Sequence, residues 1–162
     1  YADNLTFSDH AVQKGIAALK SGCDIVTDTQ MAKAGINKTI LASLGGEVHC
    51  FMSDPDVAQE ARSRGVTRAF VSMEKAAALE KPCIFAIGNA PTALLSLEQL
   101  MEEGKAAPAL IIGVPVGFVN VEISKERIIE KARAPYIVAR GRKGGSNVAA
   151  AICNALLYQI RR

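Results

Sequence analysis

The stretch from Cys83 to Leu100, CIFAIGNAPTALLSLEQL, most constrains how this 162-residue chain can fold. It opens with an apolar run, 83–87, that suits a central strand of a parallel sheet covered by helices on both faces. Gly88-Asn89 follows, and both residues adopt turn conformations readily. Pro91 suits the first turn of a helix, and a leucine-rich stripe at helical spacing extends from there. This order of strand, polar turn and helix start predicts the middle of an open α/β sheet and one wall of its ligand site.

Four other short apolar segments alternate with helical patterns, which predicts a parallel sheet with right-handed crossovers. In chain order, the expected strands are 23–26, 48–52, 83–87, 109–114 and 136–139. Five strands fit a flavodoxin-like, three-layer, doubly wound sheet with the strand order 2-1-3-4-5 better than a six-stranded dinucleotide fold. We therefore expect a single α/β domain over residues 1–162.

Side chains that follow the first and third of these strands are expected to face each other across a crevice. With the order 2-1-3-4-5, the winding reverses between these two strands, and open α/β sheets bind ligands at that point. Thr27 and Asp28 follow the first strand, and Gly88 and Asn89 follow the third. Asp28 can orient a ligand or act as an acid or base, but it can equally cap a helix, and the same choice holds for Asp54.

The segment RGRKGGS at residues 140–146 is the sharpest chemical feature of the chain. It joins three cations, three glycines and a hydroxyl between the fifth expected strand and a helix. Glycines let a backbone approach a ligand closely, and the free N–H groups at a helix start attract anions. The segment predicts an anion site, with a flexible solvated loop as the alternative. It is not a phosphate-binding P-loop, because the spacing GxxxxGK[ST] is absent.

Composition and charge exclude several classes of function. Lys and Arg total 19 against 16 Asp and Glu, and a net charge of +3 is too small to indicate a nucleic-acid partner but permits a local basic pocket. No stretch approaches the roughly 18 continuous apolar residues that span a membrane, and the polar first residues are unlike a signal peptide. The four cysteines are far apart, without metal or redox spacing, so we expect buried, reduced thiols in a cytoplasmic protein.

Neither of the two histidines has the sequence context of a catalytic or metal-binding residue. His10 is expected at the surface, in the first turn of a helix. His49 lies inside an apolar strand, where a hydrogen-bonded or half-exposed core position is the expected environment. The sequence therefore predicts no metal site and no catalytic triad.

Capping residues predict where several helices begin and end. Ser8-Asp9, Asn37 and Thr67 are expected at helix starts, because their side-chain oxygens can accept hydrogen bonds from the first turn. Gly35 and Gly65 are expected at helix ends, where glycine adopts the left-handed conformation at little cost.

Several of these stretches, taken together and in this order, resemble the precorrin-8X methylmutase family, which includes the cobalt-precorrin-8 form. The stretches are IVTD at 25–28, IGNAPTAL at 87–94, GVPVGFV at 113–119, EISK at 122–125 and RGRKGGS at 140–146, and the match runs from about Leu5 to the end of the chain. The resemblance implies a flavodoxin-like fold, a homodimer and a role in corrin-ring (vitamin B12) synthesis, beside the adjacent enzymes of that pathway.

The reaction implied by the resemblance moves a methyl group from C11 to C12 of the macrocycle. This 1,5-sigmatropic shift yields hydrogenobyrinate, or cobyrinate when cobalt is present, and the family uses no separate cofactor. The substrate is an anionic tetrapyrrole with several carboxylate arms, which charge-assisted hydrogen bonds can hold in register.

The resemblance also implies roles for particular residues. Arg68, which composition alone would place as an exposed surface arginine, matches an arginine of the family's active site and is expected to assist catalysis. Apolar side chains such as Met31, Val116 and Phe118 are expected to cover the ring. The expected substrate-binding residues are Thr27, Asp28, Met31, Asn89, Thr92, Val116, Gly117, Phe118, Arg140, Lys143, Gly144 and Ser146.

The family's acid is a histidine in a segment just upstream of the part that matches Tyr1 to Ser8, and neither His10 nor His49 aligns with it. We therefore expect residues 1–162 to be the body of the enzyme without that segment. By themselves they should bind a product-like corrin far better than they turn over precorrin-8, because loss of a general acid commonly costs about 10²–10⁴-fold in rate. The alternatives are a non-catalytic tetrapyrrole carrier and, more distantly, a response-regulator-like signalling domain with Asp28 and Asp54 as its acidic residues.

Overall fold

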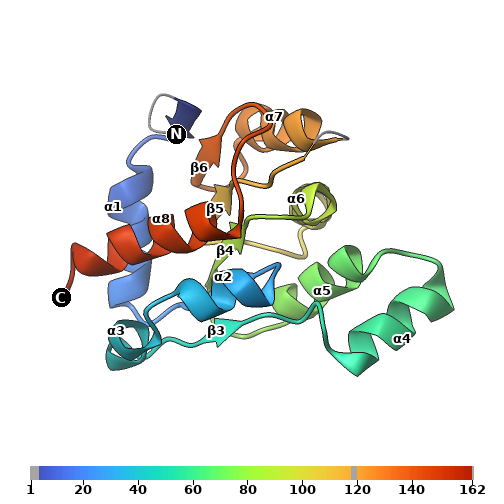
Figure 1. Ribbon diagram of the computed structural model, residues 1–162, viewed down its shortest axis with the longest axis horizontal. Coiled ribbons are helices and arrows are strands. Elements are labelled where there is room, and N and C mark those ends of the chain that lie inside the picture. Colours follow the sequence, from blue (N-terminus) through green and yellow to red (C-terminus); the bar gives the residue numbers. More distant parts are fainter. Residues whose placement is uncertain (1–3, 118–119, 162) are drawn as a thin grey trace.

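The computed structural model describes residues 4–117 and 120–161, which fold around one six-stranded sheet with helices on both faces (Figure 1). The strands are β1 Leu5–Phe7, β2 Asp24–Thr27, β3 Val48–His49, β4 Cys83–Ile87, β5 Leu110–Gly113 and β6 Tyr136–Ala139. The helices are α1 Ala11–Lys20, α2 Gln30–Gly35, α3 Lys38–Ser43, α4 Pro55–Arg64, α5 Arg68–Ala77, α6 Pro91–Glu102, α7 Val121–Lys131 and α8 Ser146–Tyr158.

The sheet has the order β1-β6-β5-β4-β2-β3. Its five parallel strands follow one another as expected, with β4 between β2 and β5. The prediction of a five-stranded, wholly parallel sheet was nevertheless wrong, because β1 adds a sixth strand that pairs antiparallel with β6 in the register Leu5↔Ala139. β1 has only three residues and none is fully buried, so it lacks the apolar run that marked the other strands.

Alternate residues of each central strand feed two separate cores, as the pleat of a strand requires. In β4, Ile84 and Ala86 join the core under α1 and α8, whereas Phe85 and Ile87 join the core under α5, α6 and α7. Every residue of β4 is buried, which explains its unbroken apolar sequence. α4 packs on α5 at one end of the molecule, away from the sheet (Figure 1).

Local sequence determines most helix ends as expected. The side chains of Asn37 and Thr67 accept hydrogen bonds from the N–H groups of Ile40 and Phe70, and both residues cap helix starts. Gly65 ends α4 with φ 69°, in the left-handed region that glycine tolerates. No helix along residues 4–117 and 120–161 is both long and apolar enough to cross a membrane.

Two of the predicted caps were wrong. Ser8 does not cap α1, because its side chain and backbone pair with Tyr136 and extend the β1–β6 ladder. His10 takes the capping position instead, with φ 58°. Gly35 is the last residue of α2 and is not left-handed; a Cβ atom there would lie 3.0 Å from Cβ of Ala150 in α8, so its small size allows the two helices to approach closely.

Candidate active site

Four turns meet at the carboxyl ends of the parallel strands, and their backbones touch. The turn after β4 packs on the start of α8: a Cβ atom on Gly88 would lie 2.7 Å from the carbonyl oxygen of Gly145. The turn after β6 packs on the turn after β5, where a Cβ atom on Gly144 would overlap the carbonyl oxygen of Val114. Only glycine fits at these two positions, because such contacts are closer than any side chain allows.

Hydrogen bonds join these turns into one surface. Thr29, after β2, shares a 2.8 Å hydrogen bond between its hydroxyl and that of Ser146. The N–H of Gly145 donates to the carbonyl of Val114 at 2.8 Å, and the N–H of Gly117 donates to that of Arg142 at 3.3 Å. Hydrogen bonds therefore hold the turns after β2, β5 and β6 and the start of α8 close together.

Asp28 shapes the turn after β4. Its carboxylate accepts hydrogen bonds from the N–H groups of Gly88, Asn89 and Ala90 at 2.9, 2.9 and 2.6 Å. The residue is buried, and burial raises the pKa of this carboxyl against the lowering effect of the three N–H groups. Asp28 does not cap the helix that follows it, because the side chain of Thr29 accepts from the first turn of α2, and its own contacts hold the turn before α6. Asp54, the other candidate, pairs with the ammonium of Lys75 at 2.8 Å.

Two of the three cations of the basic segment 140–146 form ion pairs with glutamates of α7. Arg140 forms a bidentate pair with Glu126 of α7, with N–O distances of 3.0 and 2.6 Å. Arg142 pairs with Glu122 of the same helix at 3.0 Å. Among the described residues, the ammonium of Lys143 has no partner. Exposed pairs of this kind are worth only about 0–1 kcal/mol, so a ligand carboxylate can replace the glutamates.

The start of α8 adds backbone donors to the same surface. Gly145 occupies the capping position with φ 129° and offers no side-chain cap. Among the described residues, the N–H groups of Ser146, Asn147 and Val148 have no acceptor. These free N–H groups and the positive end of the helix dipole favour a bound anion.

Lys125 is a functional candidate that the sequence analysis missed. It lies in α7, is fully buried, and donates from its ammonium to the carbonyls of Gly141 and Lys143 at 2.8 and 2.9 Å. The available signal was helical spacing: Lys125 falls on the same face as Val121 and Ile128, which are both buried. A lysine on the apolar face of a helix needs a specific polar partner.

The remaining expected residues differ in accessibility. Met31, in the first turn of α2, and Val116, on the turn after β5, are exposed apolar side chains, and Asn89 is exposed after β4. Thr27 is buried, and its hydroxyl donates to the carbonyl of Thr29 at 2.9 Å, so it has an internal partner. Thr92 is partly buried in the first turn of α6. Phe118 lies outside the described residues.

Arg68 is the first residue of α5 and is exposed. Because α5 is followed directly by β4 and so ends near the amino end of that strand, its first residue lies toward the carboxyl ends of the strands. Among the described residues, its guanidinium forms no ion pair or hydrogen bond. Arg68 therefore retains its full charge for a ligand.

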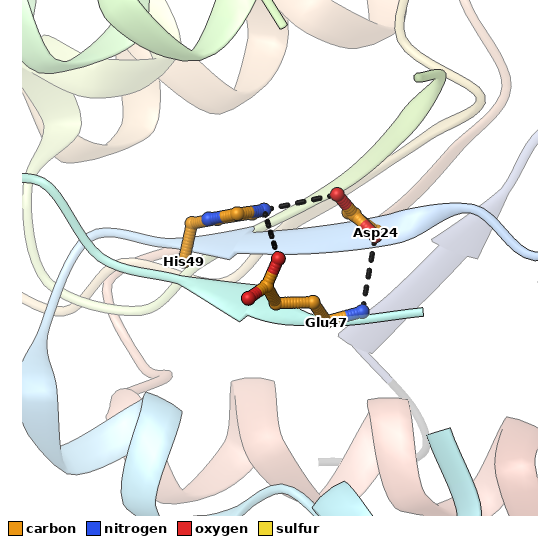
Figure 2. A group of neighbouring side chains, drawn as sticks. All are labelled: Asp24, Glu47 and His49. Carbon is orange, nitrogen blue, oxygen red and sulfur yellow. Dashed lines mark hydrogen bonds and ion pairs between the residues drawn. The ribbon is translucent and has the colours of Figure 1, made fainter. Parts of the chain in front are cut away.

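A second polar cluster lies at the opposite ends of the strands (Figure 2). The Nε2 atom of His49 is 2.9 Å from Oδ2 of Asp24 and 3.8 Å from Oε1 of Glu47. The ligand atoms of these three residues lie within 4.8 Å of one another, a grouping that can hold a metal ion and that their spacing in the sequence does not reveal.

The contacts of this cluster do not require a metal. The ammonium of Lys81 lies 3.0 Å from Oδ1 of Asp24 and already supplies the opposing charge. Asp24 also accepts from the N–H of Glu47 at 3.0 Å, and hydrogen bonds to His49 and Lys81 lower its pKa despite burial. His49 is thus a hydrogen-bonded, partly buried residue, the environment expected from its position in an apolar strand.

The fold and this surface define a class: a doubly wound α/β protein that presents backbone N–H groups and cations to an anionic ligand at the strand ends. The family model for precorrin-8X methylmutase matches residues 1–159. A cobalt-precorrin-8 methylmutase of Priestia megaterium is 48% identical over 153 residues, which are 94% of this chain and 68% of the relative. One of Salmonella typhimurium is 47% identical over 162 residues, 99% of this chain and 75% of the relative.

The structural comparison agrees. The crystal structure of a precorrin-8X methylmutase from Thermus thermophilus superposes with a TM-score of 0.86 at 38% identity, covering 98% of this chain and 77% of the other. The chain belongs to the precorrin-8X methylmutase family, and its activity is that of an isomerase. Membership favours the enzyme over the non-catalytic carrier and removes the signalling-domain alternative.

Proposed function

We propose that this protein catalyses the methyl shift from C11 to C12 of precorrin-8 or cobalt-precorrin-8, giving hydrogenobyrinate or cobyrinate. The observation that supports this substrate most directly is that free N–H groups and cations gather on segment 140–146 and the start of α8, packed against the turns after β4 and β5, in a chain of this family. A macrocycle with several carboxylate arms needs several separated anion contacts, and segment 140–146, the start of α8 and Arg68 at the start of α5 can supply them.

Carboxylate arms of the ring are held by charge-assisted hydrogen bonds. Lys143 and Arg68 have no partner among the described residues and offer their charges directly, whereas Arg140 exchanges Glu126 for a substrate carboxylate. The N–H groups at Gly144 and Ser146 add backbone donors at the start of α8. Contacts of this kind fix the ring in one orientation, which is the main contribution a protein can make to an intramolecular shift.

The faces of the ring need apolar cover. Met31 is 63% exposed and Val116 is 46% exposed, an unfavourable arrangement for apolar side chains unless a ligand or partner covers them. We assign both to the ring faces, together with Phe118 and the Gly117 backbone beside it. We also assign the side chains of Asn89 and Thr92 and the backbone around Thr27 to substrate binding, with Asp28 holding the turn after β4 in shape.

We also propose that the protein acts as a homodimer in the cytoplasm and passes its product to an adjacent enzyme of the pathway. The exposed apolar side chain of Tyr158 on α8, at 40%, suits an interface between two copies. The four cysteines are all free and buried, as is usual for a reducing compartment.

The direct test is turnover of precorrin-8 and of cobalt-precorrin-8 by the purified protein, followed by visible absorbance and by the spectrum of the product. Absence of a methyl shift with either form would refute the proposed function for the protein. Comparing the two forms decides whether cobalt is preferred. A titration with hydrogenobyrinate beside this assay tests the prediction that residues 1–162 bind product better than they turn over substrate.

Replacing Arg68 with alanine should weaken binding of the product about 10- to 100-fold, since a hydrogen bond to a charged group contributes about 1.5–3 kcal/mol. Arg133→Ala is the matched control, because Arg133 is also exposed but precedes β6 at the opposite end of the strands. Binding is measured by titration with hydrogenobyrinate, followed by visible absorbance. Equal affinities of the two variants would remove Arg68 from the site.

A further inference from the structure

Lys125 is a buried cation without a carboxylate partner. Its exposed fraction is 0%, and within the described parts of the chain no acidic oxygen lies within ion-pair distance of its ammonium. Over residues 4–117 and 120–161, its ammonium donates hydrogen bonds to the carbonyls of Gly141 and Lys143, at 2.8 and 2.9 Å. A lysine that only filled space would be replaced by an apolar residue at lower cost, because burying a charge is unfavourable.

The two hydrogen bonds orient the basic segment 140–146. In a trans peptide the C=O and the following N–H point in opposite directions. With the carbonyls of Gly141 and Lys143 turned toward the ammonium, the N–H groups of Arg142 and Gly144 are directed away from it. The ammonium thus lies behind these two peptide groups. Two other N–H groups of the segment already have backbone acceptors, since Arg140 donates to the carbonyl of Asn4 and Gly145 to that of Val114.

The charges around Lys125 leave its positive charge largely uncompensated. On α7, Glu122 and Glu126 are engaged by Arg142 and Arg140. On α6, the buried Glu98 has Arg127 at 4.0 Å. The segment itself adds the ammonium of Lys143. A buried cation at this point raises the positive potential over the turns, where the surroundings screen it less than water would.

We propose that Lys125 is a positioning residue for the substrate: it holds segment 140–146 so that the N–H of Gly144 is turned toward a carboxylate, and it adds a buried positive charge behind that N–H. The inference rests on the proposed function for the nature of the carboxylate ligand. The part of the inference that concerns structure, namely that Lys125 fixes the conformation of segment 140–146, depends on the two hydrogen bonds alone.

The two contributions of Lys125 respond differently to pH. Burial lowers the pKa of Lys125 from 10.5 to about 8, with Glu122 opposing the shift. A neutral amine still has two N–H donors, enough for both carbonyls. Raising the pH through about 8 therefore removes the charge of Lys125 but keeps its hydrogen bonds to the two carbonyls. Substrate affinity falls, while the conformation of segment 140–146 is unchanged.

The test compares Lys125→Met with Lys131→Met, which removes the same charge from an exposed position on the same helix. We expect Lys125→Met to raise KM and the Kd for hydrogenobyrinate about tenfold, with kcat within about threefold of the unaltered protein. Amide hydrogen exchange in segment 140–146 should be faster in Lys125→Met only. In the unaltered protein, the Kd should rise between about pH 7 and pH 9, and this rise should be absent in Lys125→Met.

Equal Kd values for the two variants, or a fall in kcat with KM unchanged, would overturn the positioning role. Unchanged exchange in segment 140–146 would show that Lys125 does not fix its conformation. If the unaltered protein neither binds nor converts the tetrapyrrole, the proposed function fails instead, and the exchange measurement still decides the part of the inference that concerns structure. If Lys125→Met does not fold, the pH dependence of Kd in the unaltered protein remains decisive, and a flat profile overturns the charge contribution.

Discussion

At the scale of single residues, two buried charged groups shape the candidate active site, and both act on backbone. Asp28 accepts from three successive N–H groups after β4, and Lys125 donates to two carbonyls after β6. Each is buried within the fold and faces main-chain atoms of opposite polarity. Charge is thus used at this site to give glycine-rich turns a fixed shape, which their own side chains cannot do.

The charge of Lys125 carries a cost in stability that depends on pH. Its pKa is about 8 in the fold against 10.5 in the unfolded chain, so the unfolded chain binds more protons between these values. The contribution of this residue to the free energy of unfolding therefore rises with pH between 8 and 10.5. The rise is about 3 kcal/mol, at about 1.4 kcal/mol per pKa unit, and it is reversed as the pH falls.

Two buried cysteines make the free energy of unfolding fall as the pH rises, because burial raises the pKa of Cys23 and Cys153 to about 12. The measurement is therefore the difference in unfolding free energy between the protein and Lys125→Met, from urea titrations at pH 7 and pH 10. We expect the free energy of unfolding of the unaltered protein to increase, relative to that of the variant, between pH 7 and pH 10. A difference that does not change with pH would show that the ammonium is not destabilised by burial.

At the scale of elements, the site depends on how closely the turns pack. Gly144 has an ordinary negative φ, yet a Cβ atom there would overlap the carbonyl of Val114. Gly141 in the same segment has φ 85° and open space around it. The two glycines are therefore present for different reasons, one for space and one for conformation.

This difference gives a matched pair of substitutions. Gly141→Ala should cost about 1 kcal/mol, the usual penalty for a left-handed non-glycine residue. Gly144→Ala should cost about 3 kcal/mol or more, because backbone rather than a flexible side chain must move, and it should separate the turns after β5 and β6. Thermal or urea unfolding measures both. Similar losses in the two variants would contradict the close packing of Gly144.

The elements also mark the limit of prediction from sequence. The parallel strands could be predicted because each is a buried apolar run, and the caps at Asn37 and Thr67 because the signal is local. β1 could not, because three half-exposed residues gain a partner only from β6, more than 120 positions away. The basic segment was recognised by composition, but its pairing with α7 depends on tertiary packing that spacing does not encode.

At the scale of the whole molecule, the net charge is only +3, but positive and negative side chains are concentrated around α7 and segment 140–146. Arg140 and Arg142 face Glu126 and Glu122, so that two acidic side chains compete with the substrate for the cations that should bind it. Such competition lowers affinity for any single carboxylate, but it keeps exposed arginines from binding unrelated anions.

Removing one competitor should therefore tighten binding. Glu126→Gln leaves the guanidinium of Arg140 without its bidentate partner, and an exposed pair worth about 0.2–1 kcal/mol converts to a roughly 1.5- to 5-fold lower Kd for hydrogenobyrinate. Glu130→Gln is the control, because it removes the same charge from an exposed position on α7 that faces no arginine of the segment. The gain should shrink in high salt, since screening weakens exposed pairs and ligand contacts alike. Equal tightening in both variants would indicate a general effect of net charge, and weaker binding in Glu126→Gln alone would mean that the pair positions Arg140 for the substrate.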